Sequence, residues 1–74
     1  MVKYFKQMKE EGAESVEVTK EEARHTLDGW WKPEALDEIF NEEKGFRLYT
    51  PYSEVWTQTE DGKEPMAGFY GTVG

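Results

Sequence analysis

Two alternating stretches of the chain, Phe46-Arg-Leu-Tyr-Thr50 and Glu54-Val-Trp-Thr-Gln-Thr59, decide the predicted fold. Successive side chains of a β-strand point to opposite faces, so a period of two predicts a strand with one buried face. Pro51-Tyr52-Ser53 lies between the two stretches and predicts a turn. The predicted faces carry Phe46, Leu48, Val55 and Thr57 on one side, and Arg47, Tyr49, Glu54 and Trp56 on the other.

A third strand is expected directly after these two. Glu60-Asp-Gly-Lys63 contains the Asp-Gly pair that is typical of tight hairpins. Met66-Ala-Gly-Phe-Tyr-Gly71 then supplies a further apolar stretch of strand length. The sequence therefore predicts a three-stranded antiparallel β-meander over residues 46–71.

The residues before the meander show helical signals. Thr19-Lys-Glu-Glu22 is a capping box that predicts a helix start, and Asp28-Gly29 predicts its end. Pro33 suits the first turn of a second helix, and Lys44-Gly45 suits its end, with a cation followed by a left-handed glycine. The apolar positions expected on the buried face of this second helix are Leu36, Ile39 and Phe40.

The N-terminal segment admits two interpretations. Val2, Phe5 and Met8 share a helical face, which predicts a helix that ends at Gly12, whereas Val2 and Tyr4 also fit a strand. Ser15-Val-Glu-Val18 predicts a short strand. The expected fold is thus a single α+β domain, residues 1–74, with two or three helices in an acidic part (about 1–45) and the meander packed beneath them.

Composition limits the class of protein. The chain has 74 residues and no cysteine, so neither disulfides nor thiolate–metal sites can stabilise its small core. It contains no apolar stretch of the length of a transmembrane helix or a signal peptide, and we expect a cytoplasmic protein, of bacterial or phage origin.

Negative charge is concentrated in the middle of the chain. The formal net charge is −7, and residues 10–45 carry twelve acids against four bases. Such a surface repels phosphate backbones and anionic lipids, so direct nucleic-acid binding and membrane docking are disfavoured. The acidic residues expected to face a partner are Glu21, Glu22, Glu34, Asp37, Glu38 and Glu42.

Aromatic side chains provide the second set of candidate contacts. Adjacent Trp30 and Trp31 cannot share a helix face, so one ring is expected to close the joint between the helices and the other to be partly exposed. Tyr49 and Trp56 share the polar face of the meander, where they would form a cross-strand pair. Exposed tryptophan is enriched at the centres of protein interfaces.

Catalytic and metal-binding signals are weak. Glu22-Ala-Arg-His25 has the Glu-x-x-His spacing of a helical metal site, but the chain has one histidine and supplies this motif once. We expect His25 to be a solvated histidine near acids instead of a metal ligand. No phosphate loop or zinc spacing is present, and we expect no enzyme activity, no metal and no cofactor.

Three functions remain after these exclusions. The favoured one is a small acidic module that binds another protein with a basic surface, such as a DNA mimic that occupies a nucleic-acid-binding site. Phage and mobile-element inhibitors of nucleases have this size and charge, although no motif ties the chain to a family. The alternatives are a homodimer with a small-ligand or metal site, and single-stranded nucleic-acid binding through the aromatic sheet face.

Overall fold

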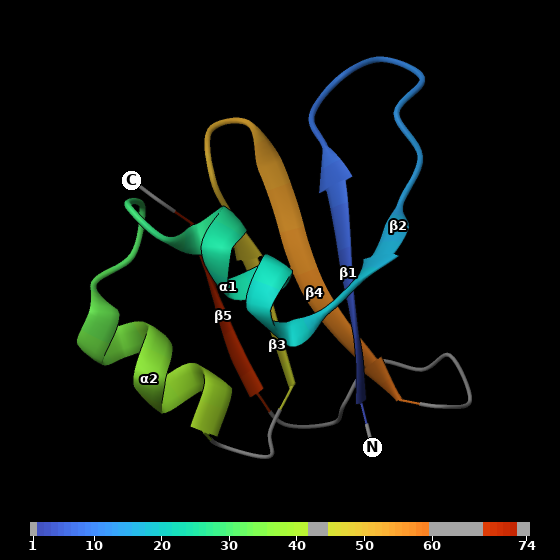
Figure 1. The fold of residues 1–74 in the computed structure, drawn as a ribbon. Coiled ribbons are helices and arrows are strands. Elements are labelled where there is room, and N and C mark those ends of the chain that lie inside the picture. Colours follow the sequence, from blue (N-terminus) through green and yellow to red (C-terminus); the bar gives the residue numbers. More distant parts are fainter. Residues whose placement is uncertain (1, 42–44, 60–67, 73–74) are drawn as a thin grey trace.

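A five-stranded mixed β-sheet with two helices on one face forms the described part of the chain (Figure 1). The computed structural model describes residues 2–41, 45–59 and 68–72. The elements, in chain order, are β1 (Val2–Met8), β2 (Val16–Val18), α1 (Lys20–Leu27), α2 (Pro33–Asn41), β3 (Gly45–Tyr49), β4 (Ser53–Thr59) and β5 (Gly68–Thr72).

The strand order across the sheet is β2-β1-β4-β3-β5. β1 runs antiparallel to β4 along its whole length, from the pair Val2↔Thr59 to the pair Met8↔Ser53. β3 is antiparallel to β4, and β5 is parallel to β3. The first strand of the chain therefore lies inside the sheet, and β2 and β5 form its two edges.

This topology corrects the predicted β-meander. The β3–β4 hairpin forms as expected, and its two faces carry the predicted residues. The third strand is β5, but it pairs with β3 and not with β4, because the other side of β4 is occupied by β1. The prediction of helices followed by a meander was wrong, since two strands precede the helices. The expected turn at Asp61-Gly62 lies outside the described residues.

The N-terminal segment is a strand and not a helix. The helical interpretation placed Val2, Phe5 and Met8 on one face. In the strand, Phe5 points to the face of the sheet opposite Val2 and Met8. Gly12, predicted as a helix stop, adopts φ +80° in the turn that joins β1 to β2. Glycine populates this left-handed region without steric cost, which explains its place there.

Both predicted helix starts are confirmed. The Thr19 hydroxyl accepts the Glu22 amide at 3.1 Å, and Asp28 caps the end of α1 before Gly29, which has φ +87°. α2 begins at Pro33 as expected. Its predicted end at Lys44-Gly45 falls partly outside the described residues: the structure describes α2 as far as Asn41, and Gly45 is the first residue of β3.

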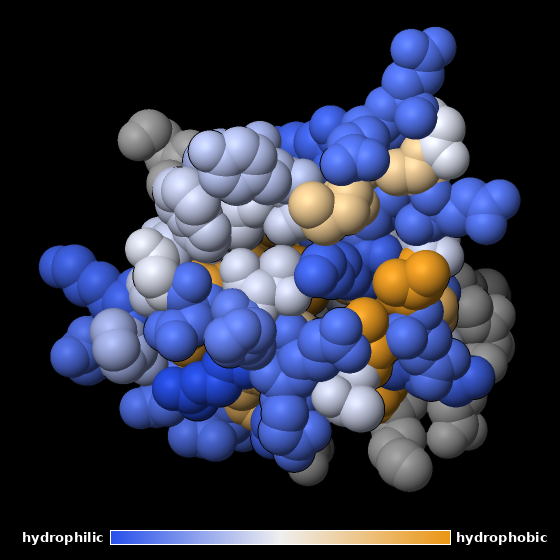
Figure 2. Space-filling model, turned by 45° about the horizontal axis from the view of Figure 1, so that its top comes forward, coloured by the Kyte–Doolittle hydropathy of each residue, from blue (hydrophilic) through white to orange (hydrophobic). Residues whose placement is uncertain are grey.

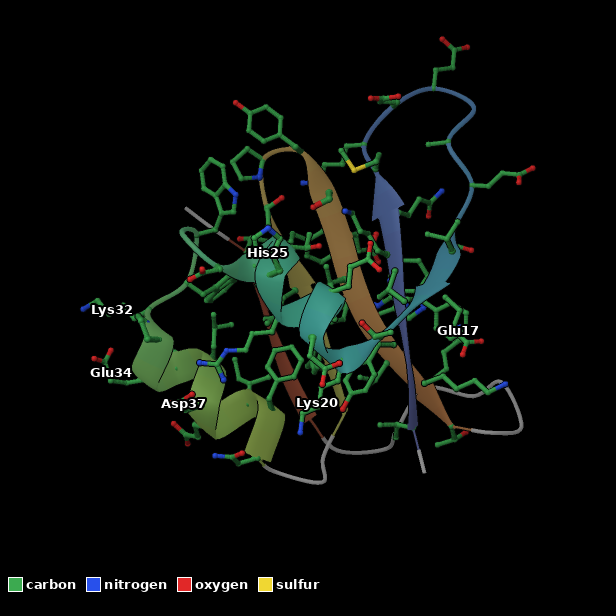
Figure 3. All side chains as sticks on the ribbon, in the orientation of Figure 1. Glu17, Lys20, His25, Lys32, Glu34 and Asp37 are labelled. Atoms are coloured by element: carbon green, nitrogen blue, oxygen red, sulfur yellow. The ribbon has the colours of Figure 1, made fainter. Side chains whose placement is uncertain are left out.

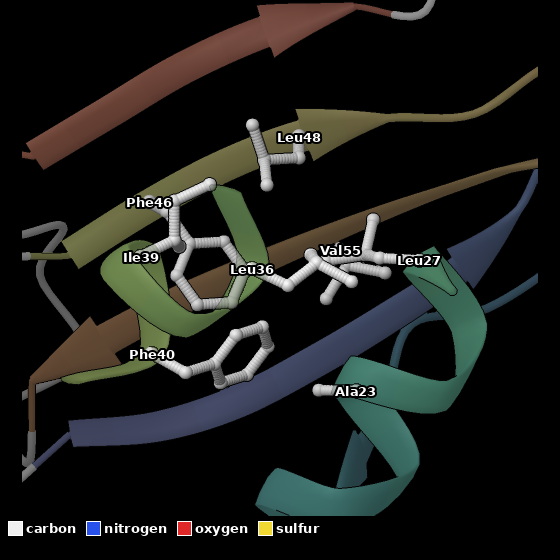
Figure 4. Close-up of a cluster of buried hydrophobic side chains, with 8 residues drawn as sticks. All are labelled: Ala23, Leu27, Leu36, Ile39, Phe40, Phe46, Leu48 and Val55. Atoms are coloured by element: carbon white, nitrogen blue, oxygen red, sulfur yellow. The ribbon is translucent and has the colours of Figure 1, made fainter. Parts of the chain in front are cut away.

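The core lies between the helices and the sheet (Figure 4). The predicted stripe of α2 is buried, and the α1 positions Ala23 and Leu27 are fully covered. Tyr4 of β1 stacks on Phe40 of α2, with 5.9 Å between ring centroids. The buried hydrophobic cluster comprises Ala23, Leu27, Leu36, Ile39, Phe40, Phe46, Leu48 and Val55.

One side-chain hydrogen bond closes the β3–β4 pairing. The Phe46 amide donates to the Thr57 hydroxyl at 2.9 Å, and both residues are buried. We expect Thr57→Val, which keeps the shape and leaves this amide without its acceptor, to lower the free energy of unfolding by about 1–3 kcal/mol. Thr57→Ser keeps the hydroxyl and is the matched control. Chemical denaturation measures both variants, and a Val variant as stable as the Ser variant would contradict the assignment.

Tyr4 provides a pH-dependent test of the same core. Burial of the phenol, and secondarily the Glu21 carboxylate, raise the Tyr4 pKa above its ordinary value of 10.0. The unfolded chain then loses this proton at a lower pH than the folded chain does. The stabilisation is complete below pH 10 and falls as the pH rises toward the folded-state pKa.

We therefore expect Tyr4→Phe to flatten the loss of stability above pH 10, measured by denaturation at a series of pH values. Glu21→Gln should lower the Tyr4 pKa measured by phenolate absorbance titration, because it removes the carboxylate charge. The pKa should stay above its ordinary value, because the burial of the phenol remains. Glu22→Gln is the control. An alkaline stability profile that Tyr4→Phe leaves unchanged would refute this account of Tyr4.

Candidate functional site

Two exposed aromatic rings form a rim at one end of the sheet. Trp30 follows α1 and is 42% exposed, and Tyr52 in the β3–β4 turn is 64% exposed. Their rings meet edge to face with centroids 5.7 Å apart, a favourable geometry for aromatic pairs. We call Trp30 and Tyr52 the aromatic rim. Figure 2 shows the end of the molecule that carries it.

Both residues of the aromatic rim have fixed backbones. The amide of Trp30 donates to the Leu27 carbonyl at 3.1 Å, which continues the last turn of α1. The Thr50 hydroxyl accepts the Tyr52 amide at 3.2 Å and the Ser53 amide at 3.0 Å, and the Tyr52 carbonyl accepts the Lys9 amide at 2.8 Å. A rigid aromatic pair loses little conformational entropy on binding, which suits it to a contact surface.

Trp31 has the opposite environment from Trp30. Its ring is half-buried against the core and lies against β5, so that a Cβ built on Gly71 would be 3.1 Å from its Cη2 atom. Its indole Nε1 is buried and has no hydrogen-bond partner among the described residues. The pair thus divides as the sequence suggested, with Trp31 at the joint and Trp30 outside.

This division predicts how the three tryptophans respond to a soluble quencher. Trp30 is exposed, whereas Trp31 is half-buried and Trp56 is 6% exposed. We expect Trp30→Phe to reduce the quenching constant measured with iodide by at least about twofold, and Trp56→Phe to leave it unchanged or higher. Equal quenching in the two variants would show that Trp30 is not the accessible ring.

The predicted acidic residues that the structure describes lie on the helix layer. Glu21 and Glu22 in α1, and Glu34 and Glu38 in α2, are exposed. Asp37 is paired with Arg24 across the two helices, with 2.5 Å between Nη2 and Oδ1. Figure 3 shows Glu34 and Asp37 on α2, beside Lys32. Glu42 lies outside the described residues.

The charge on α2 is not compensated within the helix. Pro33–Asn41 contains three acids and no base. Glu34 and Glu38 are four residues apart, so they lie on one side of the helix and repel each other. Neither has an ion-pair partner among the described residues. A basic partner would relieve this repulsion.

Glu22 and His25 do not form a larger ligand cluster in the structure. Both lie exposed on α1. Within the described ranges, no group of three or more His, Asp or Glu side chains is close enough together to hold a metal ion. The pair has no third donor there, and the geometry gives the Glu-x-x-His spacing no support as a metal centre.

The open face of the sheet carries a packed aromatic row. Phe5 of β1 stacks on Trp56 of β4, with centroids 5.9 Å apart and an interplanar angle of 15°. The Arg47 guanidinium of β3 lies 5.1 Å from the centroid of the Trp56 ring. Trp56 is consequently 6% exposed, and its Nε1 has no hydrogen-bond partner among the described residues. Sequence reasoning missed Phe5, because it left this segment open between a helix and a strand and its strand interpretation named Val2 and Tyr4 alone.

The charged groups of the open face that the structure describes contact opposite charges or aromatic rings. Arg47 forms an ion pair with Glu54, and Lys3 lies 4.0 Å from Glu17. Tyr49 is opposite Glu54 in the register and not opposite Trp56, which corrects the predicted cross-strand pair. The Lys9 ammonium lies 5.3 Å from the Tyr49 ring centroid. This face is balanced in charge, in contrast to the helix layer.

A shallow pocket of about 310 Å³ lies where β1 and β2 meet the start of α1. Its charged lining combines Lys3 and Lys20 with Glu17, and the rest comes from Val2, Tyr4, Val18 and Thr19. The Thr19 hydroxyl in this lining caps α1, and the Lys3 ammonium faces Glu17. Thr19, Lys3 and Glu17 are thus engaged in contacts within the domain.

Comparison of the chain with protein-family models, with curated proteins and with solved structures finds no match. The candidate site therefore rests on its own geometry. Within the described ranges, neither helix has the length and apolar character needed to cross a membrane. The described elements form a small, compact α+β domain.

Proposed function

We propose that this protein is a cytoplasmic binding module that docks on a basic surface of another protein through its acidic helix layer and aromatic rim. The observation that carries the proposal is the exposed Trp30–Tyr52 pair, which borders a helix layer with excess negative charge. Aromatic anchors supply desolvation energy, and the surrounding carboxylates steer a basic partner and speed its association. A phage or mobile-element inhibitor that occupies a nucleic-acid-binding site is one role of this kind.

The distribution of charge supports a protein partner. The open sheet face pairs its charges internally, whereas α2 presents uncompensated carboxylates at exposed positions. Carboxylates arranged along helices can imitate the spacing of phosphates, and a groove built for nucleic acid would attract them. Phosphates, in contrast, would be repelled by the same helix layer.

Single-stranded nucleic-acid binding through the sheet receives less support. Base stacking needs an accessible ring face, and Trp56 is in contact with Phe5 and Arg47 and almost fully buried. The Lys9 ammonium lies over the Tyr49 ring. Arg47, the basic residue whose guanidinium lies over Trp56, forms an ion pair with Glu54. Trp56 and Tyr49, the two rings expected on this face, are therefore already in contact with other side chains.

Retention of partners from a bacterial lysate tests the proposal. Immobilised protein should retain a partner at low salt and release it at high salt, since exposed charges are screened. We expect Trp30→Ala with Tyr52→Ala to weaken the interaction at least about tenfold, which corresponds to ~1.4 kcal/mol. Val16→Ala removes an exposed apolar side chain from β2 and is the matched control.

A pair of charge variants separates local contacts from net charge. Glu34→Gln with Glu38→Gln should slow association several-fold at low salt. Glu10→Gln with Glu14→Gln changes the net charge equally in the β1–β2 turn and should have a smaller effect. Retention that is insensitive to both the rim and the α2 variants would rule out this mode of docking.

A further inference from the structure

The two edges of the sheet differ in how they are protected. An exposed sheet edge presents unpaired amides and carbonyls, and proteins block it with short strands, charges or proline. The β2 edge has such features, because it is three residues long and Glu17 lies at its centre, opposite Phe5 and near Lys3. Exposed Val16 is followed there by an acidic residue.

The β5 edge has none of these features. β5 pairs with β3 on one side, and no strand of the described residues pairs with its other side. Residues 65–74 contain no charged side chain, although charged residues make up 34% of the chain. Figure 1 shows β5, in red, as the outermost strand of the sheet.

The backbone of β5 is held in place for pairing. It has five residues in register with β3, from Gly45↔Gly68 to Tyr49↔Thr72. On the helix side, the Trp31 ring lies against Gly71, where a Cβ would be 3.1 Å from the Cη2 atom of the ring, a tight contact. Thr72 is exposed. An ordered edge strand without charge is a ready template for one more strand.

We propose that β5 accepts an extended segment of a partner protein as a sixth strand of the sheet, and that this segment is rich in lysine or arginine. Main-chain hydrogen bonds to β5 would supply the affinity, and the charge of α2 would select the sign of the side chains. The choice of a basic segment rests on the proposed function. The location at β5 rests on the edge itself.

Charge argues against a second copy of this chain as the occupant. Pairing of β5 with its own copy would place both helix layers on the same face of one continuous sheet. α2, with three acids and no base, would then approach an identical helix. Like charges across an interface destabilise it, whereas a basic strand neutralises the same carboxylates.

NMR titration of the isotope-labelled chain with short end-capped peptides tests the proposal. The first peptide alternates lysine with valine, the second alternates glutamate with valine, and the third is the lysine peptide with N-methylated backbone. We expect the lysine peptide to shift the amide signals of residues 68–72 and to protect those amides that point away from β3, with affinity at least about tenfold above either control. Titration should extend to about 5 mM peptide, because a single strand binds weakly.

Two protein variants locate the contact. Thr72→Lys places a cation on an exposed position of β5 and should weaken the lysine peptide at least about tenfold. Val16→Lys places the same charge on the β2 edge and should leave binding unchanged. Circular dichroism checks that both variants are folded. The rim variant Trp30→Ala should still bind the peptide. Loss of binding through the aromatic rim can therefore be distinguished from loss of binding at the β5 edge.

Four results would overturn the edge proposal. Protection, in the free monomer, of those amides of 68–72 that point away from β3 would show that the chain covers its own edge. Protection that grows with protein concentration alone would show that a second copy occupies it. Equal binding of the N-methylated peptide would exclude strand addition. Peptide shifts confined to α1 and α2 would leave the proposed function standing and remove the edge from it.

Discussion

The antiparallel pairing of β1 with β4 is the constraint on which the rest of the structure depends. It runs the full length of both strands and places the N-terminal segment in the middle of the sheet. Because β1 occupies one side of β4 and β3 the other, β5 can join the sheet only beside β3 or β2. The same pairing brings Phe5 onto Trp56 and Tyr4 under α2. The core, the open face and the free edge are all consequences of it.

Local signals predicted the helices better than the sheet. Thr19 and Pro33 mark helix starts through interactions within a few residues, and the stripe of Leu36, Ile39 and Phe40 needs no knowledge of its partner strand. The β1–β4 pairing joins distant parts of the chain, and no short-range pattern specifies it. The segment from Val2 to Met8 stayed open between helix and strand, because apolar residues on both faces of a central strand can imitate a helical period.

The sequence predicted which kinds of residue form the candidate site, but it did not predict which of them contact each other. The sequence identified Trp30 as one of two candidate rings, since the side chains of adjacent residues cannot lie on the same face of a helix. It could not identify Tyr52 as its partner, because the contact depends on how the β3–β4 turn sits against the end of α1. It assigned Trp56 to the right face, but the burial of Trp56 follows from Phe5, whose segment the sequence left open between a helix and a strand.

The sheet separates two surfaces that differ in their balance of charge. On the open face, cations are matched to anions or aromatic rings, so little attraction remains for a charged ligand. On the helix side, Arg24 neutralises Asp37 alone, and the outward carboxylates of α2 keep their repulsion. A protein of this size gains stability by relieving such repulsion, yet the sequence retains it. On the proposed function, a basic partner relieves this repulsion, and the exposed aromatic pair beside the carboxylates supplies the apolar contact.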